Sequence, residues 1–248
     1  MKKSIAVLSG KGGAGKTLLA TNLAVAFSKL KGKTLLIDAD FGLPNAHIML
    51  GVNPEKSVED FISGTCTFQE AITKVSDNLS IVPGKSGSSS LVNLSAENGK
   101  KIWHGIKSVK SAYEYAIIDN AAGAEDYTMS LSCVESTPLI SLIDLPTNFL
   151  DAYSTIKIAY HEYNIKTFYI CVNQCSSLTD ATRVFDKFYK ITSNFLNLNM
   201  ILVGFIPHSR EIENSINKRI PFFYNEDRIE HSLIQNIVKT LDTHLKDK

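Results

Sequence analysis

The sequence predicts an α/β protein with a doubly wound, mostly parallel β-sheet that carries helices on both faces. Short β-branched runs alternate along the chain with longer segments of helical period, which is typical of strands joined by crossover helices. Several strands are apolar throughout, for example 35–37 and 116–118, as expected when helices cover both faces of a sheet. A glycine-rich loop follows the first strand, at the edge where open α/β sheets bind ligands.

The elements follow from this alternation in chain order. We expect strands over residues 4–9, 34–38, 79–82, 115–119, 138–143, 167–172 and 200–205. We expect helices over residues 16–30, 98–110, 148–163, 178–195, 211–218 and 226–245. The glycine- and serine-rich stretch 83–95 reads as a loop that is too short to link two domains. A length of 248 residues without an internal repeat therefore predicts one domain over residues 1–248.

Composition excludes several classes of protein. Hydrophobic residues make up 44% and charged residues 21% of the chain, the balance of an ordinary globular protein. No apolar run approaches the roughly 18–20 residues that cross a bilayer. A net charge of +1 gives no global attraction to nucleic acid. The four cysteines suggest no secreted disulfide framework, and we expect a cytoplasmic protein. Cys171 and Cys175 flank an apolar, strand-like segment and are expected to be buried thiols.

The glycine-rich loop satisfies the phosphate-loop pattern G-x-x-x-x-G-K-[ST]. Its residues are Gly10-Lys11-Gly12-Gly13-Ala14-Gly15-Lys16-Thr17, between a predicted strand and a predicted helix. Glycines allow such a loop to turn backbone N–H groups toward a phosphate, and the helix N-terminus adds positive potential. Lys16 is expected to neutralise the β- and γ-phosphates of a nucleotide, and the Thr17 hydroxyl to coordinate Mg²⁺.

Carboxylates follow two further apolar strands. Asp38 and Asp40 end the second predicted strand, and Asp119 ends the run 116–118. An aspartate at a strand end is usually a cap or a turn residue. Two such strand ends beside a phosphate loop favour a role near Mg²⁺ instead, because an apolar strand followed by aspartate is the arrangement that holds this metal in phosphate-loop proteins.

Lys11, early in the loop, narrows the class further. The run 11–17 resembles the deviant Walker A motif of the MinD/ParA family of ATPases, and Asp38-Ala39-Asp40 and Asp119-Asn120-Ala121-Ala122-Gly123 resemble its switch I and switch II. The similarity extends along nearly the whole chain and is strongest toward the MinD-like regulators of flagellar number and placement, the FlhG/FleN branch. Shorter pieces in the same order carry this narrower resemblance, at 41–45, 50–51, 81–84, 86–87, 151–153, 156–157, 172–173, 204–207 and 219–222.

The resemblance implies an ATP-dependent switch that forms a homodimer around Mg²⁺ and ATP and hydrolyses the nucleotide slowly. Lys11 would reach the phosphates bound by the partner subunit, as an arginine finger does. Asp40 would position the attacking water, whereas Asp38 and Asp119 would support the Mg²⁺ shell. The other implied nucleotide contacts are Gly10, Gly12, Gly13, Ala14, Gly15, Lys16, Thr17, Leu18, Asn173 at the adenine and Pro207 beside it.

The resemblance also implies partners, and two of the three positions at which the sequence departs from the family bear on them. Leu18, His47 and Asp144 replace residues more usual in the family, and the last two change the surface that would meet a protein effector or a partner GTPase. The sequence does not decide whether the chain contacts the inner face of the membrane. The final apolar stripe has a mixed-charge opposite face, which favours a helix packed on the sheet; its residues are Ile229, Leu233, Ile234, Ile237, Val238, Leu241 and Leu245.

Other classes of protein fit parts of the sequence. A ParA-like partition or positioning ATPase would contact DNA, but a helical lysine cluster is more commonly a solvated face; the cluster here is Lys100, Lys101, Lys107 and Lys110. A metabolic ATP-dependent ligase or an iron–sulfur reductase component would share the scaffold, the latter with Cys133 at the cluster. A scaffold with a vestigial nucleotide site is disfavoured by the complete set of lysines and aspartates.

Overall fold

Eight strands form one sheet in the computed structural model, which describes residues 3–84, 96–124, 126–133 and 135–246. Their order is β3-β4-β2-β5-β1-β6-β7-β8, with β3 antiparallel to β4 and all other neighbours parallel. The predicted α/β fold with a doubly wound sheet is confirmed. The strands are β1 (Lys3–Leu8), β2 (Thr34–Ala39), β3 (Thr73–Lys74), β4 (Leu79–Val82), β5 (Tyr115–Asn120), β6 (Thr137–Leu142), β7 (Thr167–Cys175) and β8 (Asn199–Pro207).

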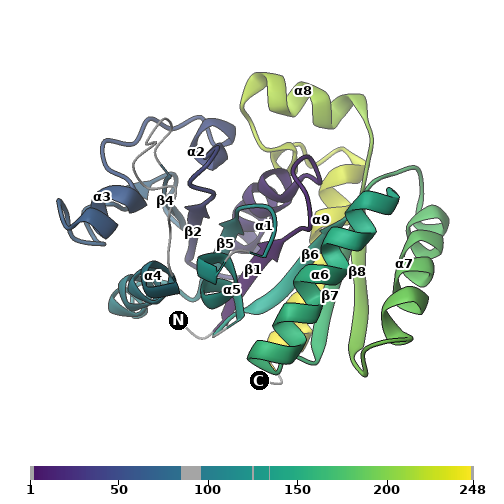
Figure 1. Cartoon of the computed structure of the whole chain (residues 1–248). Helices are drawn as coiled ribbons and strands as arrows, with labels where there is room; N and C mark the ends of the chain where they lie inside the picture. The colour runs from purple at the N-terminus through teal and green to yellow at the C-terminus, as the bar shows by residue number, and fades with distance from the viewer. Residues whose placement is uncertain (1–2, 85–95, 125, 134, 247–248) are drawn as a thin grey trace.

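Helices cover both faces of this sheet, and in Figure 1 α6 crosses in front of it while α9 runs behind. Residues of α1, α9 and the short η2 pack on one face, and residues of α3 to α7 pack on the other. The helices are α1 (Lys16–Leu30), α2 (Ala46–Met49), α3 (Val58–Ser63), α4 (Ala96–Ser108), α5 (Asp126–Cys133), α6 (Pro146–Tyr163), α7 (Leu178–Ser193), α8 (Arg210–Lys218), η2 (Phe222–Tyr224) and α9 (Ile229–Lys246).

Strand β1 shows how the sequence produces the two cores. Successive side chains of a strand point to opposite faces, and here Ile5 and Val7 join the core beneath α1 and α9. Ala6 and Leu8 join the clusters on the other face. All four side chains are buried, which explains why the strand reads as a continuous apolar run.

The structure adds short elements that the periodicity did not predict: α2, α3, α5, β3 and η2. Helix α5 was missed because Tyr127, Met129 and Leu131 alternate with serine and threonine, which reads as a strand-like period of two. All of its residues from Tyr127 to Cys133 are buried, so no exposed polar face marks the helix. Residues 85–95 of the predicted loop 83–95 lie outside the described residues.

The final helix packs on the sheet, as its sequence predicted. Ile234, Ile237, Val238, Leu241 and Leu245 lie in the core, whereas Ile229 at its first turn is 68% exposed. Most of the apolar stripe is therefore consumed by packing within the molecule. In the part of the chain that the structure describes, no helix combines the length and apolar character needed to span a membrane.

Parallel pairing brings the carboxyl ends of the central strands together. Asp38 on β2 stands in register with Asp119 on β5, and Asp119 in turn pairs with Val7 on β1. The glycine-rich loop begins two residues after Leu8, the last residue of β1. The fold thus places both aspartates and the loop at one edge of the sheet.

The opposite edge of the sheet is anchored by a buried charge on α9. The Asp242 carboxylate accepts hydrogen bonds from Lys3 Nζ at 2.7 Å and from Tyr115 Oη at 3.0 Å, and pairs with Lys31 Nζ at 2.9 Å. Burial alone would raise the pKa of Asp242, but these donors hold it well below the usual value. Asp242 therefore ties the last helix to β1, β5 and the end of α1.

We expect Asp242→Asn to lower the free energy of unfolding by about 2 kcal/mol at pH 7, because two lysines lose their shared partner. A depressed pKa gives a stabilisation that is complete above the ordinary aspartate pKa of about 4 and fades as the pH falls below it. Urea unfolding from pH 8 downward should therefore show a constant difference that shrinks in acid. Asp227→Asn, at an exposed position, is the control; a difference unchanged by acid would contradict this role.

Candidate nucleotide-binding site

The glycine-rich loop joins β1 to the start of α1 and contains two left-handed residues. Gly13 has φ 82° and Gly15 has φ 75°, a backbone region that favours glycine. A Cβ at Gly15 would lie 2.0 Å from Asn173 Nδ2, and one at Gly10 would lie 2.2 Å from the backbone N of Ala152. Gly15 is thus required both by conformation and by close packing, Gly13 by conformation and Gly10 by close packing.

Side chains from two other strands hold the carbonyl groups of this loop. Ser141 Oγ on β6 donates to the Ala14 carbonyl oxygen at 2.5 Å, and Asn173 Nδ2 on β7 donates to the same oxygen at 3.0 Å. Gln174 Nε2 donates to the Gly13 carbonyl oxygen at 3.1 Å. Because a trans peptide points its N–H away from its C=O, these bonds direct the following N–H groups away from β6 and β7.

An open cavity of about 740 Å³ lies against the loop and reaches to α8. Most predicted nucleotide contacts line it, while Gly10, Lys11 and Ala14 do not; Ala14 is buried and Lys11 is exposed. Asp38 and Asp119 do not line the cavity and are fully buried. The predicted residues that line the cavity are Gly12, Gly13, Gly15, Lys16, Thr17, Leu18, Asp40, Asn173 and Pro207.

Asp38 and Asp40 shape the segment after β2. Asp38 Oδ1 accepts the Asp40 N–H at 3.2 Å and Oδ2 accepts the Ala46 N–H at 3.0 Å, at the start of α2. Burial and the neighbouring Asp119 raise the pKa of Asp38 well above its usual value. Asp40 Oδ1 accepts the N–H groups of Gly42 and Leu43 at 3.2 and 3.1 Å, which fixes its carboxylate at the cavity wall.

Asp119 differs from the other groups of the site, because both of its carboxylate oxygens are buried and find no hydrogen-bond partner of ordinary geometry among the described residues. Burial raises its pKa to about 7, opposed by the nearby Thr17 hydroxyl and Lys16 ammonium. Burial in turn lowers the pKa of Lys16, and the charges of Asp119 and Asp40 oppose that shift. Two bare carboxylate oxygens beside a threonine hydroxyl fit a hydrated Mg²⁺, which binds through oxygen ligands and keeps several waters.

The comparisons with known proteins bear on what this edge of the sheet binds. A family model described as the CobQ/CobB/MinD/ParA nucleotide binding domain matches residues 5–240, almost the whole chain. The chain belongs to this family. The predicted resemblance to MinD/ParA proteins is therefore confirmed.

Individual proteins similar to this chain include an antiactivator, a flagellum site-determining protein and a MinD protein. The antiactivator FleN of Pseudomonas aeruginosa is 31% identical over 215 residues, which cover 87% of this chain and 77% of FleN. The flagellum site-determining protein YlxH of Helicobacter pylori is 27% identical over 218 residues, covering 88% and 74%. MinD of Pyrococcus horikoshii, solved with Mg-ADP, shares the fold with a TM-score of 0.81 at 22% identity, covering 98% and 96%.

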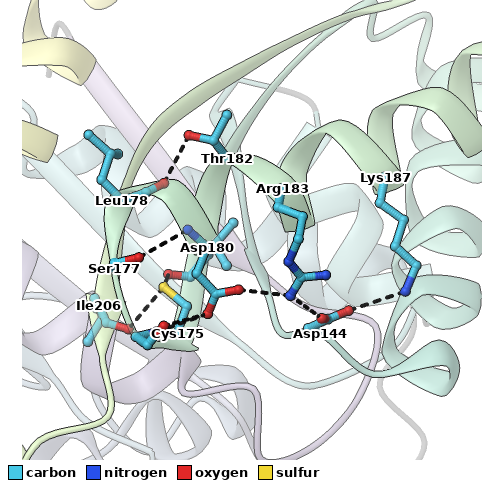
Figure 2. A network of polar contacts seen from close by, with 11 residues as sticks. Asp144, Cys175, Ser177, Leu178, Asp180, Thr182, Arg183, Lys187 and Ile206 are labelled. Atoms are coloured by element: carbon cyan, nitrogen blue, oxygen red, sulfur yellow. Dashed lines mark hydrogen bonds and ion pairs between the residues drawn. The ribbon is translucent and has the colours of Figure 1, made fainter.

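Two positions at which the sequence departs from the family, His47 and Asp144, lie near the ends of β2 and β6. His47 lies on α2, where burial lowers its pKa and its Nδ1 has no hydrogen-bond partner in the described chain. Asp144, between β6 and α6, is held by α7: Arg183 Nη2 lies 2.8 Å from Oδ2 and Lys187 Nζ lies 3.4 Å from Oδ1 (Figure 2). The altered segment after β6 is therefore fixed to the neighbouring helix.

Sequence reasoning missed several side chains of the site. Ser141 gave no signal, because it sits inside an apolar strand, and Gln174 was visible only as the neighbour of Asn173. Phe41 and Tyr127 both line the cavity, and their ring centroids lie 5.5 Å apart, which joins the segment after β2 to α5. These side chains and the groups they contact come from distant parts of the chain, so only the fold brings them together.

Cys171 and Cys175 are buried thiols, as their sequence context predicted. Cys133, Cys171 and Cys175 are buried, and Cys66 is partly exposed. Burial raises the pKa of Cys133 to about 12. A metal cluster binds thiolates, so the core position of Cys133 gives no support to the iron–sulfur alternative.

We expect Gly15→Ala to lower the free energy of unfolding by about 1–3 kcal/mol, because Cβ would sit in a left-handed residue against Asn173. Gly12→Ala is the matched control, since its Cβ would meet nothing within 4 Å. It should change the free energy by less than about 0.5 kcal/mol. Urea unfolding of both variants without nucleotide gives the comparison; equal effects would show that the loop does not depend on Gly15.

Proposed function

We propose that this chain is a MinD-like molecular switch that binds Mg·ATP, forms a homodimer around the nucleotide and resets by slow hydrolysis. Membership of a nucleotide-binding family and the geometry of the phosphate loop support the binding step. Similarity to a flagellum site-determining protein supports a role in the number or placement of a cell structure such as the flagellum. The state with ATP would present a surface to a protein effector or partner GTPase.

The observation that carries this proposal is the contrast between the two lysines of the loop. Lys16 is buried in the cavity wall, where the charges of Asp119 and Asp40 oppose the lowering of its pKa by burial. Lys11 is exposed outside the cavity, and none of the ion pairs recorded among the described residues includes it. A cation beside a nucleotide loop but outside its cavity is suited to act on the nucleotide of a second copy.

The residues of the site divide the proposed reaction between them. Mg²⁺, when bound, would neutralise charge between the β- and γ-phosphates, held by Thr17 and, through water, by Asp119. Asp40 would orient a water toward the γ-phosphorus as the bond to the β–γ bridging oxygen breaks, and Asp38 would keep the Asp40 segment in place. Lys16 and the partner's lysine would stabilise the charge on the leaving phosphate. Asn173 and Pro207 line the cavity where the adenine would lie.

The alternatives gain no specific support from the structure. In the lysine cluster that a ParA-like protein would use for DNA, Lys101 donates to the Ile62 carbonyl and lies over Phe61, and Lys107 pairs with Glu135. Two of its four lysines thus serve contacts within the protein. We propose a cytoplasmic protein with one domain over residues 1–248. Most of the apolar stripe of α9 packs in the core, so any membrane contact by this helix would involve its exposed first turn at Ile229.

We expect Lys16→Ala to reduce the affinity for Mg·ATP by about 100-fold or more, because the phosphates lose their buried cation. Isothermal titration calorimetry measures this directly. Lys33→Ala, an exposed lysine before β2 at the other edge of the sheet, is the charge-matched control and should bind as the unsubstituted protein does. Unchanged affinity of the Lys16 variant would show that nucleotide does not occupy this loop.

We expect Asp40→Ala to bind ATP within about threefold of the unsubstituted protein but to turn over roughly 100-fold more slowly, since the water loses its orienting carboxylate. It should therefore accumulate as a dimer with Mg·ATP and stay monomeric with ADP in size-exclusion chromatography with light scattering. Lys11→Ala should bind ATP and remain monomeric. A monomeric Asp40 variant in the presence of ATP would refute the proposed cycle.

A further inference from the structure

Gln174 makes a contact with the phosphate loop that no sequence motif predicts. It lies in β7 directly after Asn173, lines the cavity and is exposed there. Its Nε2 donates to the Gly13 carbonyl oxygen at 3.1 Å, across 161 residues of sequence. The contact links the wall of the cavity to the tip of the loop.

The consequence of this bond is directional. In a trans peptide the C=O and N–H groups point in opposite directions, so a carbonyl held by Gln174 turns the N–H of Ala14 the other way. Asn173 and Ser141 orient the next peptide of the loop in the same manner through the Ala14 carbonyl. Backbone N–H groups turned into such a concavity are the donors that bind phosphate. Gln174 is therefore one of three side chains that set their direction.

The backbone of Gln174 is in a conformation that glutamine rarely adopts. Its φ is 57°, in the left-handed region, and the pairing of β7 with β8 shifts register between Asn173 and Cys175. Its N–H donates to Asn173 Oδ1 at 2.8 Å, which holds the bend. A glycine would relieve the strain at no cost in backbone contacts. Because a glutamine stands here in spite of this strain, and its side chain bonds to the loop, we infer that the side-chain contact is what the position requires.

The start of α7 supports this bend. Asp180 Oδ2 accepts the Ser176 N–H at 3.0 Å, and Asp180 Oδ1 lies 2.8 Å from Arg183 Nη2. Arg183 also reaches Asp144 after β6, so the ends of β6 and β7 are tied together (Figure 2). These are the two strands whose side chains hold the loop.

We propose that Gln174 is a positioning residue of the nucleotide site: by holding the carbonyl of Gly13, which lines the cavity, it fixes the Gly13–Ala14 peptide of the phosphate loop and so sets the affinity for nucleotide. This role rests on the proposed binding of Mg·ATP. Gln174 lies outside the phosphate loop and outside both switch segments, so the proposal adds a new side chain to the groups that determine nucleotide binding.

The test compares two substitutions that separate the side chain from the backbone. Gln174→Met keeps the size of the side chain and removes the donor, whereas Gln174→Gly removes the side chain and relieves the left-handed strain. Both should bind Mg·ADP and a non-hydrolysable Mg·ATP analogue roughly three- to tenfold more weakly, the effect of one lost hydrogen bond. The Gln174→Gly protein should at the same time melt at the same or a higher temperature than the unsubstituted chain. Calorimetric titration and thermal unfolding give the two readouts.

Gln69→Met, at an exposed position in the loop after α3, is the control and should leave both readouts unchanged. If the unsubstituted protein binds nucleotide and both Gln174 variants bind equally well, the positioning role is wrong and the proposed function stands. If Gln174→Gly loses affinity and stability together, the residue is merely structural and the inference is overturned. If the unsubstituted protein binds neither nucleotide, the proposed function and the role of Gln174 both fall.

Discussion

The direction of the loop backbone between β1 and α1 is the constraint on which the rest of the site depends. A loop that binds phosphate must expose several N–H groups on one side, and the matching carbonyls must then find donors on the other. Here those donors come from β6 and β7, through Ser141, Asn173 and Gln174. Gly15 has to remain without a Cβ because Asn173 packs against it. The loop is thus shaped by two strands that follow it by more than a hundred residues.

The same edge of the sheet contains two buried aspartates, which differ in their hydrogen bonding. Asp38 and Asp119 stand in register on neighbouring strands, and neither is exposed. Asp38 satisfies both oxygens with backbone N–H groups, so it organises the segment that follows β2. Among the described residues, neither carboxylate oxygen of Asp119 finds a hydrogen-bond partner of ordinary geometry, which is costly for a buried carboxylate. A protein tolerates such a group where function requires it, and this one lies beside Thr17 and Lys16.

The fold and the family could be predicted from the sequence to a large extent. The glycine-rich loop is a local pattern, and the alternation of apolar strands with helical segments is visible without tertiary information. The first helix was predicted with the bounds that the structure shows, Lys16–Leu30. Prediction was poorer for the short elements α2, α3 and β3, because a few residues carry too little periodicity. Helix α5 is long enough to be predicted, but its residues from Tyr127 to Cys133 are all buried. It therefore lacks the exposed polar face by which a helix is recognised.

What the sequence by itself determined is therefore the chemistry that is local in the chain: a phosphate loop with two lysines, aspartates at two strand ends, and the order of the main elements. Only the tertiary structure decided which distant groups meet that loop. Ser141 and Gln174 lie in strands whose local pattern records burial and extension, and nothing in it specifies a partner. Their contacts depend on the order β1-β6-β7 in the sheet. Strand order is fixed by the packing of the whole sheet, so a pattern of neighbouring residues does not encode it.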